Sequence, residues 1–258
     1  MNDQTLNSLE AGVRPLEIGG PYRTRVGTMR RILFLGFILA LTTAGSCNSA
    51  VLFKSNFDAT AVNQPPSPTQ AVGTASIDGP AGSVLVVAAP PGAQPSGKWL
   101  QISRPTGPQV ASFQGKLTQQ PGSGTYVFST ALFMPQNTSG AATIQFEPFN
   151  QPVTSPSGFL HLDFLPTNRV RIDDDDSTIF GQFPRNQVFL VQVTLNINDT
   201  SPNAHIILSG AGASGQADRT VIPALRPQAQ QFGAVRIFMG FPHTGAFQAT
   251  NVVVQRNQ

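Results

Sequence analysis

The segment Val188-Phe-Leu-Val-Gln-Val-Thr-Leu-Asn-Ile197 decides the fold class, because apolar and polar residues alternate along it. One face of an extended chain would carry the apolar side chains Phe189, Val191, Val193, Leu195 and Ile197. The opposite face would carry the polar side chains Gln192, Thr194 and Asn196. A period of two residues over this length indicates an antiparallel strand with one buried face.

The same period recurs along most of the chain after residue 47. In residues 125–134, Tyr126, Phe128 and Leu132 share one face. Similar runs occupy 51–57, 72–77, 83–88, 98–103, 109–117, 142–149, 158–165, 169–173, 204–209, 233–240 and 247–255. Clusters of Pro, Gly, Asn and Ser separate these runs, and we find no convincing helix pattern. Short strands with regular turn signals predict an all-β fold, an antiparallel sandwich or barrel.

The N-terminal region has a different character. Two arginines, at 30 and 31, precede a ten-residue apolar run at 32–41, and Cys47 follows. The run is shorter than the roughly 20 residues that span a bilayer. It fits the apolar part of a bacterial signal peptide, which has about 7–15 residues. We therefore expect the chain to be exported.

Residues 44–47, Ala-Gly-Ser-Cys, resemble the cleavage box of bacterial lipoproteins, in which the cysteine receives a lipid. A thiolate is the nucleophile that such an attachment needs. The family's usual leucine is Ala44 here, so ordinary signal-peptide cleavage stays open. The resemblance implies a lipid anchor on Cys47. Asn48, in place of the aspartate that retains lipoproteins at the inner membrane, favours the outer membrane.

These patterns predict four parts of the chain. Residues 1–28 are polar and either disordered or not translated, since Met29 could be the true start. Residues 29–46 form a helical signal peptide, 47–54 a tether, and 55–258 the sandwich domain.

Removal of the leader would lower the net charge of the chain. The full chain has 16 basic and 13 acidic residues, of which five and three precede Cys47, leaving 11 and 10. A net charge near +1 without a basic stripe excludes a typical nucleic-acid interface. Cys47 is the single cysteine, so burial of apolar surface must stabilise the domain without disulfides.

The segments 55–58 (Ser-Asn-Phe-Asp) and 245–254, with a Phe-rich middle, resemble the concanavalin-like jelly rolls. This superfamily includes laminin-G-like lectin domains, family 16 glucanases and polysaccharide lyases. The resemblance implies a jelly-roll sandwich over about 55–254, first and last strands that pair in one sheet, and a carbohydrate ligand.

The catalytic motif of the family 16 glucanases, Glu-x-Asp-x-x-Glu, is absent. Glu147 is the single glutamate after Cys47, and Pro148 follows it. Retaining hydrolysis needs two carboxyl groups about 5–5.5 Å apart. A partnership of Glu147 with Asp163 across strands stays open. Otherwise Glu147 is expected to be a solvent-facing or edge carboxylate.

A polar patch is predicted where residues 159–164 and 169–173 form a hairpin. Alternation places His161 and Asp163 on one face of the first strand, and Arg169 and Arg171 on one face of the second. The patch could hold a sugar through charge-assisted hydrogen bonds. Alternatively, it is a solvated face with cross-strand ion pairs. Trp99 could stack on a sugar or lie in the core.

Asp173–Asp176 raises the option of calcium, which binds 6–8 oxygen ligands. Consecutive side chains of an extended segment alternate in direction, so an exposed acidic turn is the favoured interpretation. We expect no other cofactor.

The leading hypothesis is an exported, lipid-anchored module that binds polysaccharide at the cell envelope and is not an enzyme. A polysaccharide lyase or glycosidase using Glu147, His161 and Asp163 is the first alternative. A structural or adhesion lipoprotein is the second.

The lipid anchor can be tested directly. The substitution Cys47→Ser removes the thiol, so we expect loss of labelled fatty acid from the chain and its release from the membrane fraction. Asn48→Asp should remain lipidated and shift toward the inner membrane. Label that persists in Cys47→Ser would contradict the anchor.

Overall fold

The computed structural model describes residues 49–105, 107–120, 122–138, 142–154, 157–240 and 242–257, which belong to one compact unit. The predicted disordered segment 1–28, the leader 29–46 and Cys47 lie outside the described residues. The first strand begins at Ala50, so residues 50–54 belong to the sandwich, and the predicted tether is wrong for them.

Within these residues, the first half of the chain forms nine strands. They are β1 (Ala50–Ser55), β2 (Thr74–Asp78), β3 (Val84–Ala88), β4 (Lys98–Arg104), β5 (Ala111–Lys116), β6 (Gly124–Phe133), β7 (Ala142–Pro148), β8 (Leu160–Phe164) and β9 (Arg169–Ile172). The described second half adds β10 (Asp175–Gln182), β11 (Val188–Ile197), β12 (Asn203–Ser209), β13 (Gly215–Thr220), β14 (Phe232–Met239) and β15 (Gly245–Asn257).

A 3-10 turn, η1 (Pro223–Leu225), and a one-turn helix, α2 (Arg226–Gln230), connect β13 to β14. Each begins with a proline at its first or second position, where the missing N–H costs nothing. The sequence prediction missed both. Among the described residues, no helix is long and apolar enough to cross a membrane.

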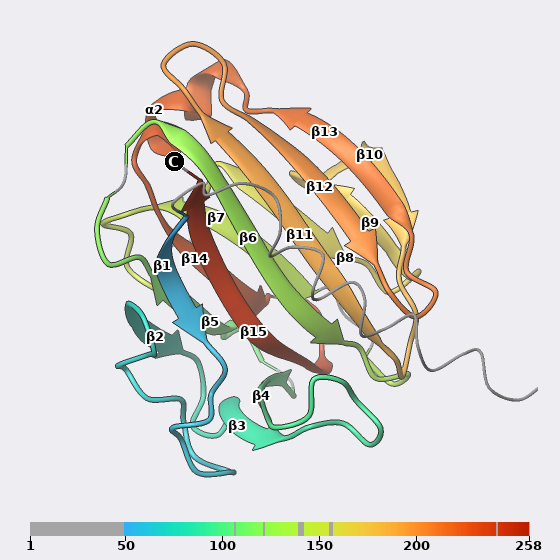
Figure 1. The fold of residues 1–258 in the computed structure, drawn as a ribbon. Helices are drawn as coiled ribbons and strands as arrows, with labels where there is room; N and C mark the ends of the chain where they lie inside the picture. Colours follow the sequence, from blue (N-terminus) through green and yellow to red (C-terminus); the bar gives the residue numbers. More distant parts are fainter. Residues whose placement is uncertain are drawn as a thin grey trace, which may run out of the picture. The chain divides into compact units, whose positions relative to one another are not determined.

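The described strands form two antiparallel sheets (Figure 1). The sheet drawn nearer the viewer, here the front sheet, has the order β13-β12-β11-β6-β15-β4-β3, with β1 also on β15. The other, here the back sheet, has the order β10-β9-β8-β7-β14-β5-β2. The predicted sandwich and the predicted pairing of the first and last strands are thus confirmed. Asn251 adopts a φ of 50° where the register of β15 shifts against β6.

Phenylalanine rings join the inner faces of the two sheets. The rings of Phe128 (β6) and Phe146 (β7) meet edge to face, with centroids 5.3 Å apart and planes at 87°. Phe159 and Phe232 also pack against Phe146. Edge-to-face pairs add attraction beyond the area that they bury, so Phe146 lies at the centre of an aromatic cluster.

The alternation rule found thirteen of the described strands and missed β10 and β13. Both are edge strands of their sheets, and none of their residues is buried. A strand without a buried face needs no apolar residue at every second position, so the alternation rule cannot detect it. The predicted hairpin tip at 210–215 is a turn, closed by the bond from the Ala213 N–H to the Gly210 carbonyl, and β13 starts at its end.

Truncation of the cluster should be costly. We expect Phe146→Ala to lower the free energy of unfolding by about 3–5 kcal/mol, because it removes a fully buried ring from between two sheets. Chemical denaturation would measure the change. Leu190→Ala, at a side chain that is 47% exposed, is the control and should change stability by less than about 0.5 kcal/mol. Equal effects would show that the cluster is not the stabilising centre.

Candidate functional site

The outward face of the back sheet carries most of the candidate residues. On β7, alternation sends Ile144 and Phe146 into the core and Thr143, Gln145 and Glu147 outward. Strand pairing aligns these with polar residues of neighbouring strands, so that Asp163 stands opposite Thr143 and His161 opposite Gln145. On the other side of β7, β14 brings Arg236 opposite Gln145. The result is a polar layer on the outside of a sheet whose inner face is apolar.

The predicted hairpin is present, and it brings the expected residues together. Strands β8 and β9 are neighbours in the back sheet, with Asp163 directly opposite Arg171. The Arg171 Nη2 atom lies 3.4 Å from Asp163 Oδ2. His161, Asp163 and Arg171 therefore share one face, as alternation predicted, and Arg169 lies exposed at its edge.

The guanidinium of Arg171 forms ion pairs with acidic side chains of the protein itself. Its Nη2 atom lies 2.7 Å from Asp174 Oδ1, and its Nη1 atom lies 2.8 Å from Asp176 Oδ1. The Arg169 Nε–H donates to the Gly181 carbonyl at 2.8 Å. Of the two interpretations of this patch, the geometry resembles the ion-paired face more than a set of donors held ready for a ligand.

The acidic run 173–176 begins in the turn between β9 and β10, where Asp173 and Asp174 have positive φ angles, and its last two residues begin β10. Arg219 Nε lies 2.8 Å from Asp173 Oδ2, and a depression of about 320 Å³ opens beside it, next to His161, Ile222 and Leu225. Within the described residues, no group of three or more His, Cys, Asp or Glu side chains is arranged to hold a metal ion.

Glu147 is neither solvent-facing nor at an edge, so that prediction is wrong. It lies on β7, between β8 and β14, and its side chain is fully buried. The Gln114 amide of β5 donates both to Glu147 Oε2 and, at 3.1 Å, to the main-chain carbonyl of Gln151. Gln151 belongs to the β7–β8 loop, of which the structure describes residues 149–154 and 157–158, and its carbonyl thus lies over this part of the sheet.

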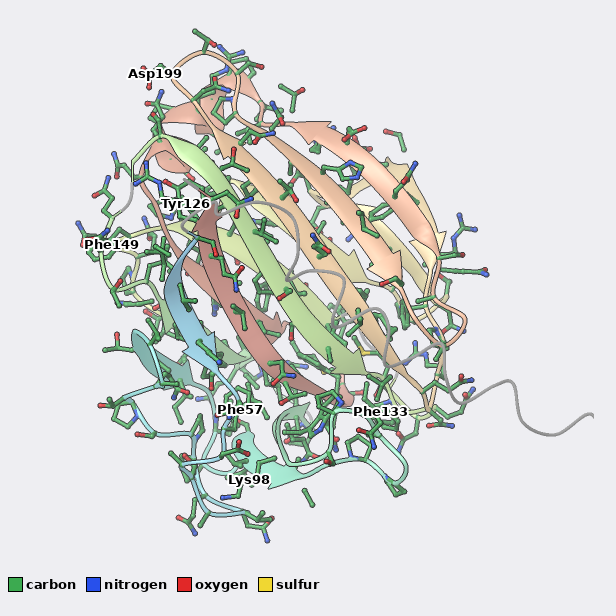
Figure 2. The ribbon with its side chains drawn as sticks, in the orientation of Figure 1. Phe57, Lys98, Tyr126, Phe133, Phe149 and Asp199 are labelled. Atoms are coloured by element: carbon green, nitrogen blue, oxygen red, sulfur yellow. The ribbon has the colours of Figure 1, made fainter. Side chains whose placement is uncertain are left out.

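Close packing holds the β7–β8 loop on the polar layer. The loop leaves β7 at Phe149, which Figure 2 labels, and the Phe149 N–H donates to the Gln231 carbonyl at 2.7 Å. At its other end, Gly158 lies so close to Gln145 that a Cβ atom on it would be 2.4 Å from the Gln145 side chain. A residue larger than glycine would force either the Gln145 side chain or the loop to move.

Glu147 and Asp163 do not form a catalytic pair. Asp163 stands opposite Thr143, four residues along β7 from Glu147. At about 3.3 Å per residue, the two positions are roughly 13 Å apart along the strand. Glycosidases need roughly 5–5.5 Å for retention or 6.5–9.5 Å for inversion.

Burial dominates the electrostatics of these two carboxyl groups. It raises the pKa of Glu147 from 4.5 to about 7, against the opposing effects of the Gln114 hydrogen bond and of the charges on Arg236 and Lys116. It also raises the pKa of Asp163, although the Thr143 hydroxyl donates to Asp163 at 2.7 Å. Both groups are thus more easily protonated than exposed carboxyl groups.

A second depression, which we call the phenylalanine hollow, has a volume of about 280 Å³ and opens on the same face. It is lined by Asp78, Gly79, Gln109, Val110, Thr154, Arg236 and Phe238. The strand register explains it: Ser112 of β5 stands between Phe238 of β14 and Asp78 of β2. A small side chain between two larger ones leaves a space above it.

Arg236 lies beneath the ring of Phe238. Its side chain is buried, with Nη2 3.3 Å from Ser112 Oγ and Cζ 4.7 Å from the Phe238 ring centroid, within cation–π range. Burial lowers the pKa of Arg236, and the carboxyl groups of Glu147 and Asp78 oppose this effect. The hollow therefore combines an aromatic ring, a guanidinium and a carboxylate.

Sequence reasoning missed the hollow, and of the two positions that it left open for Trp99 the structure shows the core. Trp99 lies on β4 of the front sheet, fully buried, and its Nε1–H donates to the Pro95 carbonyl at 3.1 Å. It cannot line a groove with Arg169 and Arg171 on the other sheet or stack on a bound sugar. Asp78, Ser112 and Phe238 lie on three different strands, and nothing in their local sequence marks them as neighbours.

No protein-family model matches the sequence, and no curated protein matches it. Solved structures do share its architecture. A GH131 beta-glucanase catalytic domain from Podospora anserina superposes with a TM-score of 0.53 at 11% identity, over 81% of this chain and 97% of that one. An endo-1,3-beta-glucanase from Streptomyces sioyaensis gives 0.50 at 11% identity, over 82% and 98%.

Lectin I from Ulex europaeus gives a TM-score of 0.47 at 11% identity, over 81% of this chain and 98% of that chain. At these identities the glucanase structures show the fold alone. They confirm the predicted antiparallel β-sandwich of jelly-roll type.

The raised pKa of Glu147 predicts the pH dependence of stability. A carboxyl group that is protonated more readily in the folded state stabilises it fully below pH 4.5, and this contribution is lost as the pH rises to about 7. We expect Glu147→Gln to remove this dependence and to raise the free energy of unfolding at pH 8 by up to about 3 kcal/mol. Denaturation at pH 5 and pH 8 would measure it. A variant less stable than the parent at pH 8 would contradict the buried-charge account.

Proposed function

We propose that this chain is an exported, lipid-anchored module that binds carbohydrate in the phenylalanine hollow without cleaving it. The observation that carries the proposal is the arrangement of Phe238, Asp78 and Arg236 around one depression. Small-molecule sites characteristically combine an apolar or aromatic surface with a few convergent polar groups.

Each group in the hollow matches a part of a sugar ring. A pyranose has an apolar face of C–H groups and a rim of hydroxyl groups. The half-buried ring of Phe238 offers a flat apolar surface to the first. The Asp78 carboxylate accepts hydrogen bonds from two hydroxyl groups, and the Arg236 guanidinium donates to hydroxyl or ring oxygens. A volume of about 280 Å³, at the low end for ligand sites, suits one sugar unit of a longer chain.

The arrangement of carboxyl groups favours binding over hydrolysis. Glu147 is covered by the β7–β8 loop, and Asp163 lies too far along the sheet to act with it. In the hollow itself, Asp78 is the one acidic side chain among the described lining residues. Hydrolysis by either stereochemical route needs a second carboxyl group near it.

The fold and the N-terminal sequence suggest where and on what the module acts. The two beta-glucanase structures described above superpose with TM-scores of 0.50 and 0.53, so a β-glucan is the first probe to test. The signal-peptide pattern and Cys47 would place the module at the cell envelope, where polysaccharides are exposed.

Binding should be measured first on a glycan array of neutral and acidic polymers and then by calorimetry with a soluble β-1,3-glucan. We expect Phe238→Ala and Asp78→Asn each to weaken binding about tenfold or more, because each removes one of the convergent contacts. Leu190→Ala, on the front sheet, is the control and should bind like the parent.

Two results would overturn this assignment. Binding that survives Phe238→Ala but is abolished by Arg169→Ala and Arg171→Ala would place the ligand on the β8–β9 hairpin. Absence of binding to every polymer on the array would remove carbohydrate as the ligand class.

A further inference from the structure

Two buried oxygen atoms in touching side chains lack a donor. Glu147 and Gln114 are both fully buried, and they are joined by the bond from Gln114 Nε2 to Glu147 Oε2. Among the described residues, neither Glu147 Oε1 nor Gln114 Oε1 has a hydrogen-bond partner. Both atoms are acceptors, and a buried acceptor without a donor is unfavourable. One proton on the Glu147 carboxyl would satisfy both.

We propose that Glu147 and Gln114 form a proton-operated latch that positions the β7–β8 loop over the back sheet. Neither residue lines the phenylalanine hollow, so both act on it through the loop. The effect on ligand binding rests on the proposed function, whereas the latch itself does not.

In the ionised state, the Gln114 amide ties the sheet to the loop. One of its two N–H groups donates to the carboxylate of Glu147, and the other donates to the Gln151 carbonyl at 3.1 Å. The first bond is charge-assisted and fixes the orientation of the amide. With the amide fixed in this way, its second N–H group points at the Gln151 carbonyl.

Protonation changes what the amide can do. The carboxylic acid gains one O–H donor, taken up from water, and keeps one acceptor oxygen. Its O–H can donate to Gln114 Oε1 while the amide N–H donates to the remaining carboxyl oxygen. This ring uses one amide N–H and the amide oxygen. In the proposed latch, the amide rotates toward Glu147 as the ring closes, and this rotation moves the other N–H away from the Gln151 carbonyl. The loop then loses its bond to β5.

Charged groups surround Glu147 on several sides. Strand β14 contributes Arg236 and β5 contributes Lys116, and both favour the carboxylate. Strand β8 contributes His161, opposite Gln145, and α2, which packs against β7, carries Arg226. The loop sequence at 149–158 contains no titratable residue. Burial outweighs the cations and brings the pKa of Glu147 to about 7, so the latch responds near neutral pH.

The loop connects the latch to the hollow. Thr154, three residues after Gln151, lines the phenylalanine hollow. When the Gln151 carbonyl is released, the wall that Thr154 provides is no longer fixed. We therefore expect ligand binding in the hollow to weaken as the pH falls through about 7.

The test is an NMR titration of the full chain labelled with ¹³C at the glutamate carboxyl group, where only Glu10 and Glu17 accompany Glu147. We expect one carboxyl to titrate near pH 7 and the others near the ordinary value of about 4.3. The carbonyl ¹³C shift of Gln151 should follow the same midpoint. Hydrogen exchange in residues 151–154, corrected for its intrinsic pH dependence, should be roughly fivefold faster at pH 6 than at pH 8, because the loop has then lost one neutral hydrogen bond to the sheet.

Three variants separate the latch from general effects of pH. Glu147→Gln imitates the protonated acid, so exchange in the loop should be fast at both pH values. Gln114→Ala should keep the titration of residue 147 but abolish the response of Gln151. Asp163→Asn removes the other carboxyl group of raised pKa on this face and should leave the response of Gln151 intact.

The latch is overturned if the Gln151 carbonyl shows no step near pH 7, or if the step persists in Glu147→Gln. A step that disappears in Glu147→Gln supports the latch even where no polymer binds, in which case only the proposed function fails.

Discussion

The sandwich depends on the burial of two apolar sheet faces against each other, since the single cysteine, Cys47, leaves no disulfide to close the domain. Phe146 and Phe128 meet where the two sheets face each other. Because successive side chains of a strand point to opposite faces, filling the core uses only every second residue. The alternate positions on β7, β14 and β5 remain available for polar groups, so the strands that hold the core together also carry the candidate site.

The polar layer on the outside of the back sheet has an energetic cost. Glu147 and Arg236 are both removed from water, and they share partial compensation from Gln114, Ser112 and each other's charge. Replacement of buried ionic groups by well-packed apolar ones is often neutral or stabilising. Titratable groups with perturbed pKa values cluster at functional sites. Stability alone therefore does not explain the layer, and its buried, perturbed carboxyl groups make it a candidate functional site.

Local patterns were sufficient for the fold and for one hairpin. Alternation in segments such as 188–197 predicted the antiparallel sandwich, and the short link between β8 and β9 predicted that Asp163 would face Arg171. The hollow was beyond such reasoning, because β2, β5 and β14 become neighbours only through the order of strands in the sheet. The burial of Glu147 was missed for a related reason. Its cover comes from a loop whose path over the sheet has no periodic signal in the sequence.

The back sheet shows why charge alone did not identify the site. Arg171 was one of the two arginines that the sequence predicted to hold a ligand, yet Asp163, Asp174 and Asp176 surround it, and Asp174 lies in the adjoining turn. An arginine so placed already has the carboxylates that its geometry favours, and a sugar hydroxyl would have to displace them. Arg236 instead contacts a serine hydroxyl and an aromatic ring and lines a depression in the sheet. The groups that surround an arginine are thus revealed by the order of strands in the fold and not by the local sequence.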